Sequence, residues 1–111
     1  MHELTQKLID RTHARTVAGQ IDWVEGPGKN AYAFDADNYQ VVVEATPSTA
    51  SIRITDTEGR ELETLDAEDL AAIRAPGGAD YEQIVREIHQ SARRVALGTD
   101  EAIERILRTL E

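Results

Sequence analysis

The hydrophobic period of the chain changes twice. Near both ends apolar residues recur every three or four positions, the spacing of a helix with one buried face. Between about Ile21 and Leu65 apolar and polar residues alternate, which is typical of strands with one buried face. The pattern predicts one two-layer α+β domain over residues 1–111. An antiparallel meander of four or five strands is expected to pack one face against N-terminal and C-terminal helices.

The first predicted helix extends from about His2 to Val17. Gly19 follows the last turn, where a residue with positive φ ends many helices. The expected buried stripe consists of apolar residues at helical spacing: Leu4, Leu8, Ile9 and Val17.

Four turns set the register of the predicted meander: Gly26–Lys29, Asp35–Asn38, Thr46–Thr49 and Asp56–Gly59. The expected cross-strand pairs are Trp23 with Tyr32, Ile21 with Phe34, Phe34 with Tyr39, Tyr32 with Val41, Val43 with Ile52, Val41 with Ile54, and Ile54 with or near Leu62. All four turns send the same residues to the face beneath the helices: Ile21, Trp23, Tyr32, Phe34, Tyr39, Val41, Val43, Ile52, Ile54 and Leu62. The solvent face is expected to carry Asp22, Gln40, Glu44, Arg53, Glu61 and Glu63, with Val42 as an apolar exception.

Three helices are predicted after the meander. Asp66 is expected to cap a short one, with Leu70 and Ile73 facing inward and Ala75–Gly78 ending it. Asp80 is expected to cap the most regular amphipathic helix, whose stripe is Tyr81, Ile84, Val85, Ile88, Ala92, Val95 and Ala96. Gly98 ends this helix, and Thr99 or Asp100 caps the last one. The residues expected to be buried there are Ile103, Ile106, Leu107 and Leu110.

Charge and composition exclude several classes of protein. The net charge is −9, from 12 basic and 21 acidic residues, and it opposes binding to nucleic acids or anionic membranes. The sequence contains no cysteine, no membrane-length apolar run and no apolar leader, so a cytoplasmic location is expected. An acidic surface favours a protein partner with a basic patch. A monomer or a weak homodimer is expected, with the strand around Ile21 as the less charged sheet edge.

No catalytic, cofactor-binding or metal-binding motif is present. The histidines His2, His13 and His89 are widely spaced, and no serine lies in a nucleophile motif. The segment Gly26–Lys29 resembles a phosphate loop only in its letters, because no helix is predicted to follow it. The seven acids between Asp56 and Asp69 lack the spacing of a calcium loop and are interpreted as a solvated surface. Catalytic residues, cofactors and metals are therefore not expected.

One cluster remains as a candidate site. The predicted register brings four aromatic residues to one end of the sheet: Trp23, Tyr32, Phe34 and Tyr39. They form either part of the core or a binding patch that the helices leave open. The favoured function is a non-enzymatic protein-binding or accessory domain. The alternative is a small-molecule sensor or enzyme with a pocket between sheet and helices, in which His13 or His89 titrates.

The chain also resembles a loose group of small bacterial proteins without an established activity. The resemblance depends on three segments: Gly19-Gln20-Ile21-Asp22-Trp23, the strand and turn from Ile52 to Gly59, and the arginine- and alanine-rich stretch from Ala92 to Gly98. It implies a leading helix, a meander and a closing helix, and it implies no activity.

Overall fold

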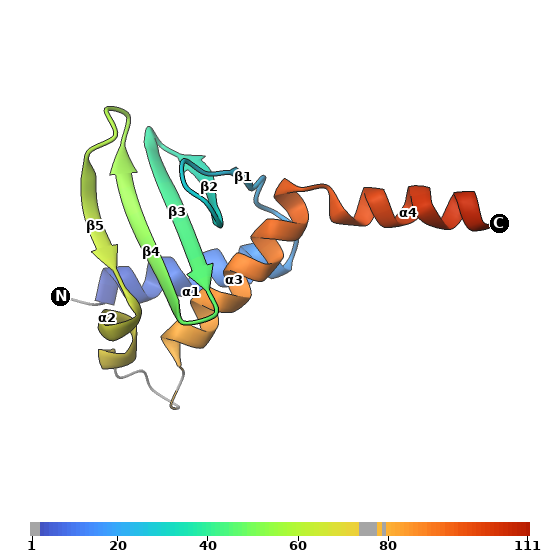
Figure 1. The fold of residues 1–111 in the computed structure, drawn as a ribbon. Coiled ribbons are helices and arrows are strands. Elements are labelled where there is room, and N and C mark those ends of the chain that lie inside the picture. The colour runs from blue at the N-terminus through green and yellow to red at the C-terminus, as the bar shows by residue number, and fades with distance from the viewer. Residues whose placement is uncertain (1–2, 74–77, 79) are drawn as a thin grey trace.

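The computed structural model describes residues 3–73, 78 and 80–111 (Figure 1). His2 and most of the predicted stop at Ala75–Gly78 lie outside the described residues. The elements in chain order are α1 (Glu3–Val17), β1 (Val24–Glu25), β2 (Ala31–Ala36), β3 (Tyr39–Thr46), β4 (Thr49–Asp56), β5 (Glu61–Leu65), α2 (Ala67–Ala72), α3 (Tyr81–Ala96) and α4 (Thr99–Leu110).

The five strands form one antiparallel sheet in the order β1-β2-β3-β4-β5, so each strand pairs with its neighbours in sequence. Helix α3 crosses one face of the sheet and contacts β1 to β4, and α1 packs beside α3 on that same side (Figure 1). Helix α2 lies at the end of β4 and β5. The predicted α+β architecture, with a meander and helices on one face, is confirmed.

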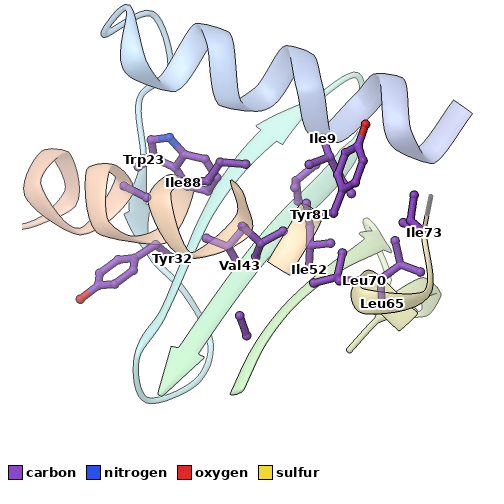
Figure 2. Packing of buried hydrophobic residues seen from close by; sticks show 14 residues of the cluster. Ile9, Trp23, Tyr32, Val43, Ile52, Leu65, Leu70, Ile73, Tyr81 and Ile88 are labelled. Carbon is purple, nitrogen blue, oxygen red and sulfur yellow. The ribbon is translucent and has the colours of Figure 1, made fainter. Parts of the chain in front are cut away.

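The core lies between the sheet and the helices α1, α2 and α3 (Figure 2). Its most deeply buried large side chains include Ile9 from α1, Leu70 from α2, Val43 from β3, and Val85 and Ile88 from α3. Leu70 and Ile73 are both buried, as the sequence predicts, and Asp66 forms a capping box with Asp69 at the start of α2. Asp80 caps α3 as predicted, because its carboxylate accepts the backbone N–H groups of Glu82 and Gln83.

The predicted stripe on α1 is wrong in part. Leu4 and Val17 are 80% and 67% exposed. The buried face instead consists of Ile9 and three threonines at helical spacing: Thr5, Thr12 and Thr16. Two of these hydroxyls form hydrogen bonds: Thr16 donates to the carbonyl oxygen of Thr12 at 2.6 Å, and Thr5 donates to the carboxylate of Glu63 at 3.4 Å. Gly19 has φ of 73° and ends α1 as predicted.

The first two hairpins differ from the prediction by two residues. Tyr32 pairs with Glu25 and Val43, and Phe34 pairs with Val41. In the second hairpin Asp37 and Asn38 both have positive φ, and they form a two-residue loop between paired Ala36 and Tyr39. Such loops match the twist of the flanking strands better than the four-residue turn that was expected. A shift of two residues keeps every side chain on its predicted face.

The third hairpin pairs Val43 with Ile52 and Val41 with Ile54, as predicted. In the fourth hairpin Ile54 lies near Leu62, as predicted, but the predicted faces of Leu62 and Glu63 are wrong, because the register shifts between Ile54 and Thr55. Glu63 therefore pairs with Ile54, and Leu65 pairs with Ile52 and enters the core. Glu63 shares the helix-facing side of the sheet and its carboxylate accepts a hydrogen bond from Thr5 at 3.4 Å, whereas Leu62 is 55% exposed.

Val42, the apolar exception on the outer face, packs in a small cluster of buried apolar residues. Val42 lies beside Ala33 on β2 and Arg53 on β4, and Val42 and Ala33 are buried together with Ala31. Arg53 forms an ion pair with Glu44, the residue opposite Ala31. The outer face therefore carries a small buried apolar cluster beside an ion pair, and not Val42 alone as an isolated exception.

Candidate interaction surface

The four aromatic residues of the predicted patch do not share one environment. Trp23 is 2% exposed, its indole N–H donates to Thr16 Oγ1 at 3.2 Å, and its ring meets Phe34 edge-on at 4.9 Å. Tyr32 is also buried, and its ring lies 5.2 Å from the ring of His89. Tyr39 is 47% exposed. The structure therefore places Trp23 and Tyr32 in the core, Phe34 partly buried against it, and Tyr39 at the surface.

Tyr39 borders an open hollow of about 440 Å³ at the tips of the β2–β3 and β4–β5 hairpins. Most of the residues that line it have polar side chains, among them Asp35, Gln40 and Asp56. These groups already bond to one another or to their own turns: Gln40 donates to Asp35, and Asp56 accepts from its hairpin. Neither His13 nor His89 borders the hollow. Within the described residues no three histidines or acids converge on a possible metal position.

The turn between β4 and β5 is organised by the carboxylate of Asp56. It accepts the backbone N–H groups of Arg60 and Glu58, both at 2.9 Å, and the Nε–H of Arg60 at 2.7 Å. The backbone hydrogen bond from Arg60 is the main reason why the pKa of Asp56 lies below its usual value, and it outweighs the opposing effect of desolvation. Asp56 therefore serves the turn and is not free for a ligand.

The two described histidines occupy separate places. His13 on α1 has its Nε2 atom 3.4 Å from the Glu87 carboxylate on α3. His89 contacts the carbonyl oxygen of Asn30 through Nε2 at 2.8 Å. Between α1 and the strands β4 and β5 lies a hollow of about 10 Å³, which holds at most one water molecule. No histidine lines that hollow, and its volume is too small for a substrate. It is therefore not the pocket that the enzyme hypothesis requires.

Four large apolar side chains of α4 are exposed. The sequence predicts Ile103, Ile106, Leu107 and Leu110 to be buried, and this is wrong: they are 43%, 57%, 55% and 76% exposed. Figure 1 shows α4 projecting away from the sheet, with α3 as its neighbour. Gly98, at φ of 63°, redirects the chain between the two helices, so the stripe of α4 does not reach the core. These four residues are called the α4 stripe below.

The charged residues of α4 are segregated along its axis. The first half carries Asp100, Glu101 and Glu104, and the second half carries Arg105 and Arg108. Three of these residues form ion pairs within the chain: Asp100 pairs with Arg94, and Glu101 pairs with Arg105 at 3.4 Å. Val95, which the sequence predicts to be buried on α3, is 44% exposed, and Leu97 between the two helices is 43% exposed.

Comparisons with protein-family models, with curated proteins and with solved structures found no match to this chain. Within the part of the chain that the structure describes, no helix is long and apolar enough to cross a membrane. The α4 stripe could be found from the sequence as an amphipathic pattern, but its exposure could not.

Proposed function

We propose that this chain is a non-enzymatic protein-binding domain in which the sheet and helices α1 to α3 form a rigid base and α4 makes the contact. One observation carries the proposal: all four residues of the α4 stripe are exposed although α4 is strongly amphipathic. A contiguous apolar face on a soluble domain is typical of a binding surface. An amphipathic helix is also one of the common ways in which proteins recognise each other.

The base has the properties of a support. Trp23, Ile88 and Leu70 belong to one continuous core, and the hollow beneath α1 is too small for a substrate. Asp35, Gln40 and Asp56, which border the larger hollow at the hairpin tips, form hydrogen bonds within their own hairpins. These features support a scaffold that presents α4 more than they support the alternative, a sensor or enzyme with a pocket between sheet and helices.

The net charge of −9 adds a second preference, for a partner with a basic patch. Attraction of this kind weakens as the salt concentration rises, whereas contact with the α4 stripe does not. Salt dependence therefore separates binding through general charge from binding through α4.

A pair of matched variants tests the proposal. Ile106→Gln with Leu107→Gln removes half of the α4 stripe, and Glu101→Gln with Arg105→Gln changes the polar side of α4; both keep the net charge at −9. The immobilised wild type is expected to retain a binding protein, either another copy or a different chain. The Ile106→Gln, Leu107→Gln variant is expected not to retain it, and the Glu101→Gln, Arg105→Gln control is expected to retain it as the wild type does. Quantitative binding of the purified partner to all three forms is the measurement. Equal retention by wild type and stripe variant would overturn the proposed role of α4.

A further inference from the structure

We infer that the partner of the α4 stripe is a second copy of this chain, with the two α4 helices packed antiparallel. The inference rests on the proposed function, because it takes α4 to be a protein-binding element. It specifies what that element binds, and in which direction.

The short length of α4 is the first reason to expect that another protein surface packs on its apolar face. The helix has 12 residues, and the described contacts join it only to α3. Isolated helices of about 12–15 residues are marginal in water, and helices in proteins owe most of their stability to packing of the apolar face. A second copy supplies that packing wherever this chain is concentrated.

The spacing of the stripe is self-complementary. In an antiparallel pair with Ile106 opposite Leu107 of the second copy, Ile103 lies opposite Leu110. Every residue of the stripe then faces an apolar residue, and the residues at 103, 106 and 110 follow the alternating steps of three and four seen in paired helices.

The charge segregation of α4 also fits this direction. Antiparallel packing sets the acidic first half of one helix beside the basic second half of the other. Glu104 then lies nearly level with Arg108 of the second copy, and no described intrachain ion pair uses either residue. Parallel packing would instead place acidic halves side by side. The helix dipoles agree, since they oppose each other in the antiparallel pair.

The size of the base gives an independent argument. Packed helices lie about 8–10 Å apart, whereas the molecule measures 36 and 25 Å along its two shorter directions. Helix α4 begins at Thr99, directly after the junction with α3. A parallel pair would bring both bases to the same end, where bodies of this width leave each other little room. The antiparallel pair places them at opposite ends.

Sedimentation equilibrium of the full chain at several concentrations tests the pairing. Four apolar residues from each copy make a small interface, for which we expect a monomer–dimer equilibrium with a Kd on the order of micromolar to hundreds of micromolar. Ile106→Gln with Leu107→Gln is expected to raise the Kd by at least about tenfold, while Glu101→Gln with Arg105→Gln changes it by less than about twofold. Higher salt is expected to preserve the dimer or tighten it, since two chains of −9 repel each other.

Cross-linking tests the direction, because the chain has no cysteine of its own. The variants Ile103→Cys and Leu110→Cys are mixed and oxidised. Antiparallel packing is expected to give mainly the mixed 103–110 disulfide. Mainly 103–103 and 110–110 disulfides would overturn the antiparallel arrangement.

Other outcomes separate this inference from the proposed function. A wild type that stays monomeric to about 1 mM, yet binds a different protein through α4, overturns the dimer and leaves the function standing. A dimer that persists in the stripe variant overturns the inference and points to another surface, such as the edge strand β1. If the chain shows no self-association and also no α4-dependent binding of another protein, both the dimer and the proposed function are overturned.

Discussion

Trp23 connects three parts of the core at the scale of a single residue. Its indole N–H bonds to Thr16 on α1, its ring meets Phe34 on β2, and it directly precedes β1. A ring with these contacts holds the first helix against the edge of the sheet. Its burial sets Trp23 apart from the two residues of β1 that follow it, both of which are exposed.

We expect Trp23→Ala to lower the free energy of unfolding by about 3–5 kcal/mol, because it leaves a large cavity in the core. Chemical denaturation of the purified chain measures the change. Tyr39→Ala is the matched control, since Tyr39 is 47% exposed, and a change within about 0.5 kcal/mol is expected there. A small effect of Trp23→Ala would mean that the ring belongs to a surface patch.

Thr16 gives a second prediction at this scale. Its hydroxyl donates to the carbonyl oxygen of Thr12 and accepts the indole N–H of Trp23, and Thr16 is 4% exposed. Thr16→Val keeps the shape but leaves the indole N–H without an acceptor, which is expected to cost about 1–3 kcal/mol in unfolding free energy. Thr16→Ser retains the hydroxyl and is expected to lose less. A larger loss from Thr16→Ser than from Thr16→Val would show that the methyl group, and not the hydrogen bond, matters.

The turns explain, at the scale of elements, which predictions succeeded. A shift of two residues in the first two hairpins left each strand's faces unchanged, so Trp23, Tyr32 and Val41 still reached the core. The irregularity after Ile54 changes the parity of β5, and this moved Leu62 out and Leu65 in. Alternation reveals which residues share a face, but a bulge leaves no mark in the pattern of a five-residue strand.

The Asp56 turn carries a prediction for pH. The pKa of Asp56 is lowered in the folded chain, so the bonded carboxylate stabilises the fold above the unfolded pKa of about 4. This contribution is lost as the pH falls from there through the lowered folded value. Asp56→Asn is therefore expected to be less stable than the wild type at pH 6, with the difference shrinking below about pH 4. Unfolding free energies across this range provide the check, and a constant difference would contradict the prediction.

The predictions for the apolar stripes of α1 and α4 were wrong for different reasons. On α1 the buried positions are threonines, which a search for apolar periodicity passes over in favour of Leu4 and Val17. On α4 the stripe itself is real, but Gly98 decides the direction of the helix, and periodicity carries no information on what covers a face. The sequence therefore predicts the amphipathic pattern of the α4 stripe, but it does not predict that the stripe is exposed as a candidate interaction surface.

The base and α4 are expected to be energetically separate at the scale of the whole molecule. None of the residues of α4 is buried, and the ion pair of Arg94 with Asp100 is exposed. A chain that ends at Gly98 should therefore unfold with nearly the same free energy as the full chain, within about 1 kcal/mol at concentrations where both are monomeric. If the α4 stripe instead packed on the sheet, as its periodicity suggests, its loss would remove about 1.5–3 kcal/mol for each of its four side chains. Denaturant melts of the two chains distinguish these cases, because a base that loses most of its stability on truncation cannot be the independent support that the proposed function requires.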